Sequence, residues 1–167
     1  MQTRQAAADD MPGVREVARK AWETAYDFLP EREHEAAMRE RYAIDRLERV
    51  LADDEDEFVV AVEGGSVVGF AYADPVDPAK RVGDAELRAL HVHPDNWDEG
   101  VRTALLDHVE AVLGDRGYSQ LEVLVFADAL HEQSFFEEQG FERIENRVAD
   151  LLAGDTEPVY RYYHEFK

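Results

Sequence analysis

The sequence predicts a single α/β domain with a mixed central sheet, and two observations support this prediction. The first is a hairpin signature, in which the apolar runs 58–62 and 67–72 flank Gly64-Gly65. A Gly-Gly pair tolerates the positive φ angles of a tight turn. The second is an alternation of strand-like and helix-like periodicity after residue 86. Such alternation is typical of a β-α-β unit with a parallel strand pair and a right-handed crossover.

The remaining elements follow from the spacing of apolar residues. Alternating apolar positions indicate strands, a repeat of three or four indicates helices, and Gly and Pro mark the boundaries. The expected strands are 3–7, 58–62, 67–72, 86–93, 121–125, 141–152 and 156–166, and the expected helices are 14–25, 31–51, 101–114 and 130–139. The segment 74–83, with its two prolines, is expected to form a loop. The sheet should thus hold six or seven strands, flanked by about four helices.

Length and composition indicate one globular unit over residues 1–167. A chain of this length with 45% hydrophobic residues can bury one sizeable core. No apolar run reaches the roughly 18–20 residues needed to cross a bilayer, and the polar segment 1–10 does not resemble a secretory signal. The chain has no cysteine, which excludes disulfides, thiolate metal sites and cysteine nucleophiles. We therefore expect a cytoplasmic protein with no membrane partner.

The charge balance is strongly acidic. Asp and Glu number 38 against 18 Lys and Arg, which gives a formal net charge of −20. Such a surface repels nucleic acid, because phosphate binding needs clustered Lys and Arg. Two interpretations remain: a field that attracts a cationic substrate, or a haloarchaeal-type adaptation to a salty cytoplasm. We favour the second, because the acidic residues are spread along the whole chain and the Debye length at molar salt is only about 3 Å.

The clearest sign of chemistry is a strand–loop–helix junction. The strand 86–93 stops at Pro94, and the short loop 95–100 leads directly into the next helix. Unpaired N–H groups at a helix start, together with the positive end of the helix dipole, form a natural phosphate site. An ordinary turn between a strand and a helix has the same pattern, so the junction alone leaves both interpretations open.

Three segments carry a more specific signal: Glu86-Leu-Arg-Ala-Leu-His-Val-His-Pro94, Gly100-Val-Arg-Thr-Ala-Leu-Leu106 and Ser134-Phe-Phe-Glu-Glu-Gln-Gly-Phe141. Together they resemble the GNAT family of N-acetyltransferases. The resemblance implies acetyl-CoA as acyl donor, a small-molecule or peptide amine as acceptor, and no metal. It also implies that the donor contacts Leu90, His91, Val92, Trp97, Asp98, Glu99, Gly100, Val101, Arg102, Thr103 and Phe136.

The loop departs from the family pattern, which has Gln or Arg, two residues, Gly, one residue, then Gly or Ala. Only Gly100 keeps this pattern; Trp97 stands in the first position and Arg102 in the last. Backbone donors survive side-chain replacement, and Arg102 could add a charge that pairs with phosphate. Asp98 and Glu99 suit a helix start but add negative charge beside a phosphate site.

The resemblance also assigns catalytic and acceptor-binding residues. Glu86 matches a position where some members carry a carboxylate base that acts through water, and His91 is an alternative base. A backbone N–H near His91 or Val92 is expected to face the thioester oxygen, and the strands must diverge there to admit the pantetheine arm. Trp22, Tyr26 and Phe28 stand where the family usually builds its acceptor pocket. The alternatives are a surface carboxylate for Glu86, a packed histidine, and core packing for Trp22.

Two further departures leave the activity open. Phe136 replaces a Tyr that often protonates the CoA thiolate in this family, so water would have to supply that proton, and packing is the expected role of Phe136. Glu132 replaces a residue that is commonly small. His91 and His93 share a face but have no third ligand nearby, and zinc needs at least three.

The leading hypothesis is therefore transfer of acetyl from acetyl-CoA to a primary amine by direct attack. The alternative is an acyl-CoA-binding regulatory or interaction domain with little or no catalysis. The last strand, 159–166, offers an edge for a possible homodimer.

Overall fold

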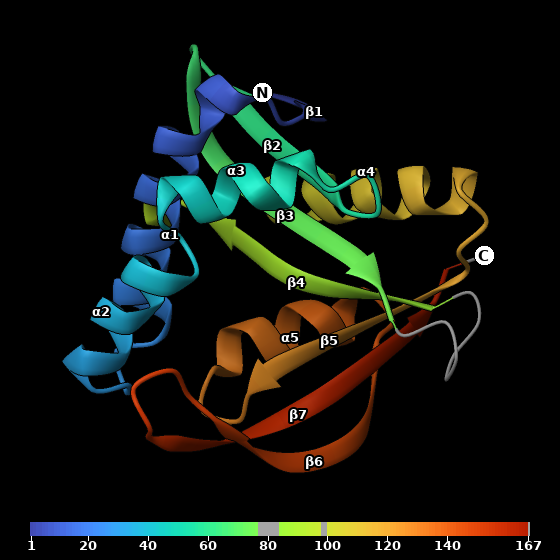
Figure 1. Cartoon of the computed structure of the whole chain (residues 1–167). Helices are drawn as coiled ribbons and strands as arrows, with labels where there is room; N and C mark the ends of the chain where they lie inside the picture. The colour runs from blue at the N-terminus through green and yellow to red at the C-terminus, as the bar shows by residue number, and fades with distance from the viewer. Residues whose placement is uncertain (77–83, 98–99, 167) are drawn as a thin grey trace.

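The computed structural model describes residues 1–76, 84–97 and 100–166. These residues form a seven-stranded sheet in the order β1-β2-β3-β4-β5-β7-β6 (Figure 1). The strands are β1 Gln2–Gln5, β2 Glu57–Glu63, β3 Ser66–Pro75, β4 Asp84–Val92, β5 Gln120–Phe126, β6 Glu142–Asp150 and β7 Thr156–Glu165. The helices are α1 Met11–Ala25, α2 Glu31–Glu40, α3 Ile44–Ala52, α4 Val101–Asp115 and α5 Leu130–Glu138, with short 3-10 turns η1 Ala8–Asp10 and η2 Pro94–Asn96. The predicted α/β class and mixed sheet are confirmed.

One strand pair is parallel and the others are antiparallel. β4 and β5 run parallel, joined by the crossover through α4, as the β-α-β pattern predicted. The β2–β3 hairpin turns at Gly64 and Gly65, whose φ angles are 58° and 81°. Both angles lie in the left-handed region that glycine adopts at no steric cost. The Gly-Gly signature therefore located this turn correctly.

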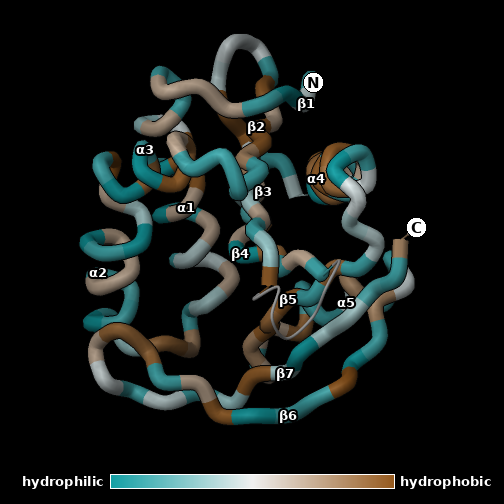
Figure 2. Tube along the Cα trace, turned by 45° about the vertical axis from the view of Figure 1, so that its right-hand side comes forward, coloured by the Kyte–Doolittle hydropathy of each residue, from teal (hydrophilic) through white to brown (hydrophobic). Residues whose placement is uncertain are grey.

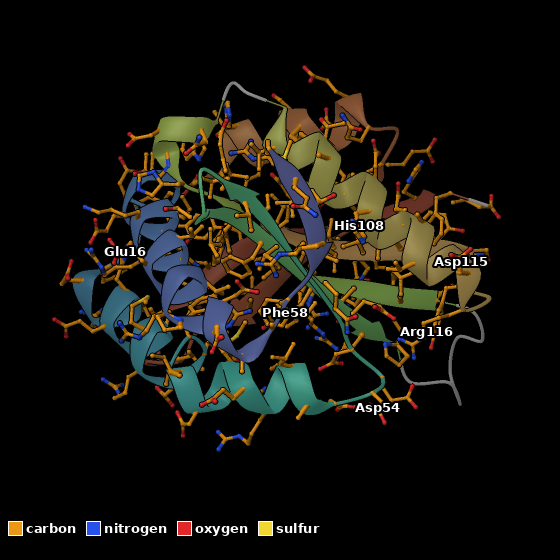
Figure 3. All side chains as sticks on the ribbon, turned by 90° about the horizontal axis from the view of Figure 1, so that it is seen from above. Glu16, Asp54, Phe58, His108, Asp115 and Arg116 are labelled. Carbon is orange, nitrogen blue, oxygen red and sulfur yellow. The ribbon has the colours of Figure 1, made fainter. Side chains whose placement is uncertain are left out.

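The helices cover both faces of the sheet, as Figure 3 shows from above. Gly69 of β3 lies under α4, because a Cβ there would sit 3.0 Å from Leu105 Cδ1 and 3.1 Å from Val101 Cγ1. The next residue, Phe70, points to the opposite face, since side chains alternate along a strand. There its ring contacts Tyr42, whose ring in turn contacts Trp22 of α1. The missing side chain at Gly69 thus lets α4 approach the sheet closely.

Two predicted elements were wrong in their extent. Residues 31–51 form two helices, α2 and α3, rather than one. Tyr42 lies in the break between them and is fully buried, so the chain leaves the helix to bring this ring into the core. β3 also continues through Asp74 and Pro75, which pair with Glu86 and Ala85; the rest of the predicted loop, 77–83, lies outside the described residues.

Charged groups cover the outside and apolar groups fill the centre. Glu16 of α1, Asp54 of the turn between α3 and β2, and Asp115 of α4 are exposed, whereas Phe58 of β2 is 3% exposed (Figure 3). Apolar residues follow β2 and β5, and hydrophilic residues dominate α2 and β6 (Figure 2). Among the described residues, no helix has the length and apolar character required to span a membrane.

Replacing Gly69 with Val should lower the free energy of unfolding by about 1–3 kcal/mol, because the new methyl groups meet Leu105 and Val101 in a packed interface. Urea unfolding of the variant measures this change. Ser66→Val in the same strand is the control, since Ser66 is exposed. Equal stability of the wild type and the Gly69→Val variant would contradict the close approach of α4.

Candidate active site

The site begins where two strands separate. The β4–β5 ladder joins Asp84–Leu87 to Gln120–Val123 and stops there, although β4 continues to Val92 and β5 to Phe126. Figure 1 shows the two strands diverging toward their carboxyl ends. We call the space between residues 88–92 and 124–126 the β4–β5 gap. The divergence expected between these strands is present.

The register of β4 on β3 decides which backbone groups face this gap. The N–H of His93 donates to the carbonyl oxygen of Val68 at 2.8 Å, and Val92 and His91 pair with Gly69 and Phe70. Bonded and non-bonded pairs alternate along an antiparallel ladder. The His91 N–H therefore points toward β3, whereas the N–H groups of Leu90 and Val92 point into the β4–β5 gap.

The helix start at the end of the gap supplies further donors. Gly100 precedes α4 with a φ of 75°, which a residue with a side chain adopts only at a cost. The N–H groups of Val101, Arg102 and Thr103 belong to the first turn, where no intrahelical acceptor exists. The Val101 side chain is fully buried, so it can offer only its backbone. Asp98 and Glu99 lie outside the described residues.

Trp97 covers the mouth of the gap. Its indole N–H donates to the carbonyl oxygen of Val92 at 2.8 Å, and its ring stacks on His131 of α5, with centroids 5.2 Å apart. The Arg102 guanidinium lies 5.2 Å from the Trp97 ring and 5.6 Å from that of Phe135. Trp97, Arg102, His131 and Glu132 help to line a cavity of about 230 Å³, which we call the α4–α5 cavity.

A second cavity lies on the α1 side of the same strands. This α1–β4 cavity measures about 230 Å³, and its lining includes Trp22, Tyr26, Arg41, Glu86 and His91. Of the three residues predicted to bind the acceptor, Trp22 and Tyr26 reach it. Phe28 is not among the described residues that line it. It packs on Tyr26 and Phe126 at centroid distances of 6.1 and 5.7 Å.

Glu86 and His91 both line this cavity, and burial shifts the pKa values of their side chains in opposite directions. Burial raises the pKa of the Glu86 carboxyl, and Arg88, which contacts it at 2.6 Å, opposes that rise. Burial, with the charges of Arg41 and Arg102, lowers the pKa of the His91 imidazole to about 3. His91 is thus neutral at ordinary pH and binds a proton only weakly. Its ring packs 5.7 Å from Phe70 and 6.0 Å from Tyr26.

Phe136 faces the core. It is 4% exposed, and its ring contacts those of Phe135 and Phe141 at 5.2 and 5.1 Å. This agrees with the packing role expected for it. In the described part of the chain, no group of three His, Asp or Glu side chains is arranged to hold a metal ion.

Sequence reasoning missed a side-chain contact that lies between the two cavities. The Tyr26 hydroxyl donates to Glu132 Oε1 at 2.6 Å, across 106 residues of sequence. Tyr26 lines the α1–β4 cavity and Glu132 lines the α4–α5 cavity, so this hydrogen bond forms part of the wall between them. Burial raises the pKa of the Glu132 carboxyl to about 7, although Tyr26 and the charge of Arg102 oppose the rise. One sign of this contact was present in the sequence, since Glu132 stands where the family commonly has a small residue.

Comparison with known proteins agrees with this arrangement. Residues 14–141 match the sequence model of the acetyltransferase (GNAT) family. The match covers most of the chain, so the chain belongs to this family and is an acetyltransferase by class. No curated protein matches the chain in sequence.

Solved structures share the fold over the whole chain. The PaiA N-acetyltransferase from Thermoplasma acidophilum, in complex with coenzyme A, is 20% identical with a TM-score of 0.82, and the match covers 99% of this chain and 98% of that one. A probable acetyltransferase from Staphylococcus epidermidis is 16% identical with a TM-score of 0.84 and 99% of both chains covered. The ribosomal-protein-S18-alanine N-acetyltransferase from Escherichia coli is 18% identical with a TM-score of 0.74, covering 99% of this chain and 94% of that one.

Replacing Glu132 with Gln should raise the free energy of unfolding, relative to the wild type, more at pH 8 than at pH 5. The folded-state pKa is raised from 4.5 to about 7, so the contribution of Glu132 to stability is present below about pH 4.5 and is lost as the pH rises through 7. Gln cannot ionise and still accepts from Tyr26. The relative gain at pH 8 should be about 1–3 kcal/mol, measured by urea unfolding at both pH values.

Glu137→Gln is the matched control, because Glu137 accepts a phenol hydrogen bond of the same 2.6 Å length from Tyr162 but is exposed. A gain for Glu132→Gln that is equal at pH 5 and pH 8 would contradict the raised pKa.

Proposed function

We propose that this protein transfers an acetyl group from acetyl-CoA to a primary amine of a small molecule or peptide, acting as one cytoplasmic domain of residues 1–167. The observation that carries the proposal is the β4–β5 gap, into which the N–H groups of Leu90 and Val92 point by register. The gap lies in a chain of the acetyltransferase (GNAT) family. The structural neighbour from Thermoplasma acidophilum binds coenzyme A, which supports the same donor here.

The donor is proposed to occupy the gap from the α4 side. Its pantetheine arm would lie against the outward-facing backbone of β4, and its pyrophosphate would meet the first-turn N–H groups of α4. Arg102 adds a guanidinium at this helix start, which suits phosphate oxygens. Donor binding competes with the hydrogen bond of Trp97 to the Val92 carbonyl. We therefore expect Trp97 to change its contacts when acetyl-CoA binds.

The chemical step needs a base on the acceptor side. An alkyl ammonium has a pKa near 10 and must lose a proton before it attacks. We assign that role to Glu86, acting directly or through water, because it lines the α1–β4 cavity and its pKa is raised toward neutrality. The low pKa of His91 makes it a poorer base.

The bonds then change in a single exchange. The amine nitrogen forms a bond to the thioester carbon, and the negative charge on the carbonyl oxygen is met by the N–H of Leu90 or Val92. The carbon–sulfur bond breaks, the nitrogen releases its extra proton to water to give the neutral amide, and CoA leaves as a thiolate. Phe136 has no proton to give, so we assign protonation of the thiolate to water.

One observation favours the alternative of a binding or interaction domain with little catalysis. Trp97 lies at the mouth of the gap, where it is held by its hydrogen bond to the Val92 carbonyl and by stacking on the His131 ring. If this arrangement were permanent, no donor would enter. Stabilisation of the protein by acetyl-CoA, followed by release of free thiol when an amine is added, would rule out this alternative.

Gly100→Pro should abolish the thermal stabilisation given by millimolar acetyl-CoA. Proline holds φ near −65°, whereas Gly100 has a φ of 75°, so the N–H groups that follow it would be redirected. Thermal unfolding in molar KCl, with and without acetyl-CoA, measures the effect. Gly64→Pro is the control, since it strains a turn of similar φ in the β2–β3 hairpin. An unchanged shift in Gly100→Pro would place the pyrophosphate elsewhere.

Glu86→Gln should lower kcat/KM roughly 10²- to 10⁴-fold, as loss of a general base does. In the wild type, activity should fall as the pH drops through the raised pKa of Glu86, because only the carboxylate accepts a proton. The variant should lose this acidic limb. Initial rates of thiol release from pH 5 to 9 check both points, with the exposed Glu48→Gln as control. An acidic limb that persists in Glu86→Gln would assign the base to another group.

A further inference from the structure

Arg41 has no carboxylate partner among the residues that the structure describes, which is unexpected in so acidic a chain. It follows α2 directly and is half-buried. Among the described residues, no Asp or Glu lies within ion-pair distance of it, although the chain has 38 such residues. Its guanidinium instead lies 6.0 Å from the Trp22 ring and 5.8 Å from the Tyr42 ring. Its strongest electrostatic partners are Tyr42 and Tyr72, and Tyr72 also forms a side-chain hydrogen bond with it. Arg41 thus has neutral polar and aromatic neighbours.

Two cavities meet at this guanidinium. Arg41 lines the α1–β4 cavity and also a neighbouring space of about 420 Å³, which we call the arginine cavity. Arg46, Arg49 and Arg88 line the arginine cavity too. Arg88 also lines both cavities, so the two spaces adjoin along the line between Arg41 and Arg88.

The arginine cavity holds carboxylates as well as guanidiniums, and they pair with only some of its arginines. Asp53, Asp56 and Asp74 also line it, and Asp74 forms an ion pair with Arg88 at 2.7 Å. Burial and the neighbouring carboxylates raise the pKa of Asp56 to about 6. Within the described part of the chain, Arg46 has no carboxylate at ion-pair distance, as is true of Arg41. Arg49 is paired with Asp45 at 3.6 Å, and Arg88 also contacts Glu86 at 2.6 Å. Among the described residues, Arg41 and Arg46 are therefore the two arginines of this cavity that an anionic acceptor can reach without displacing a carboxylate from an ion pair.

Within the α1–β4 cavity, the proposed base and the free cation are separate. Glu86 pairs with Arg88 at 2.6 Å, and Arg41 is not within ion-pair distance of it. Asp150 also lines the cavity without pairing with Arg41. The cavity thus presents a carboxylate at one place and an unpaired guanidinium at another. An amine that also carries an anion is complementary to both.

We propose that the acceptor is an amine that also bears a carboxylate, with the carboxylate held by Arg41 and the amine directed toward Glu86. This assignment rests on the proposed function for the transfer step itself. The planar guanidinium can donate two parallel hydrogen bonds to one carboxylate. The contacts of Arg41 with Trp22 and Tyr42 hold it beside the cavity while leaving its donors free of acidic partners. The arginine cavity then receives the longer part of an acidic acceptor.

The test compares matched amines with and without a carboxylate. γ-Aminobutyrate against n-butylamine represents free amino acids, and Ala-Glu amide against Ala-Gln amide represents acidic peptides. Assays in 1 M KCl screen the repulsion from the whole acidic surface, because the Debye length is about 3 Å, while a direct ion pair persists. In the wild type, kcat/KM for at least one carboxylate-bearing member should exceed that of its partner roughly 10- to 100-fold.

Arg41→Gln should lower kcat/KM for the carboxylate-bearing amine roughly 10- to 100-fold more than for its neutral partner, which removes the preference. Arg41→Lys keeps the charge without the planar fork and should keep part of the preference. Arg39→Gln, an exposed position on α2 paired only with Glu40 at 3.3 Å, is the control. Equal losses with both members of a pair in Arg41→Gln, or no preference in the wild type, would overturn the assignment.

Calorimetric titration without acetyl-CoA separates this inference from the proposed function. Arg41-dependent binding of a carboxylate-bearing amine, with no acetyl transfer to any amine, would keep the inference and overturn the function. Acetyl transfer to amines without a preference for a carboxylate would support the proposed function and overturn the inference about Arg41. If no carboxylate-bearing amine binds and none is acetylated, the acceptor assignment is wrong.

Discussion

The early end of the β4–β5 ladder is the constraint on which the rest of the site depends. After Leu87 and Val123 the two strands no longer pair, so the outward N–H and C=O groups of Leu90 and Val92 have no strand partner. Buried backbone groups need partners, and the Val92 carbonyl takes one from Trp97. The same separation makes room for the aromatic rings on the α1 side. A continuous ladder would satisfy the backbone but leave no place for an extended ligand.

Much of the fold was predictable because local chemistry and global structure agree. The Gly-Gly hairpin and the β-α-β unit follow from periodicity and turn residues, which act over a few positions. The edge expected at the last strand was wrong, because β7 pairs with β5 on one side and β6 on the other. The division of 31–51 into α2 and α3 was not predictable in this way. It serves the burial of Tyr42 between Trp22 and Phe70, and a highly charged segment gives no local sign of that tertiary demand. The extension of β3 through Pro75 likewise depends on pairing with β4.

The site was predictable only in part, because some of its contacts join distant segments of the chain. Glu86, Trp22 and Tyr26 were placed by family resemblance, and they do line one cavity. Glu132 and Arg41 were not assigned a role, because their surroundings come from distant segments. Tyr26 and Glu132 are 106 residues apart, and Arg41 stands in a run of charges where a solvated side chain is the ordinary expectation. What distinguishes Arg41 is the absence of a nearby acid in the described residues, which only a three-dimensional structure can show.

The charges around β4 act together on the chemistry. Burial, together with the charges of Arg41 and Arg102, lowers the pKa of His91, which leaves this ring neutral and packed among aromatic side chains. In the proposed reaction, proton acceptance therefore falls to Glu86, whose pKa burial raises. A protein of net charge −20 would repel an anionic acceptor over long distances at low salt. At molar salt that repulsion is confined to about 3 Å, so the unpaired guanidinium of Arg41 can determine binding by direct contact. An acidic surface and a guanidinium that binds the acceptor carboxylate are therefore compatible in a salty solvent.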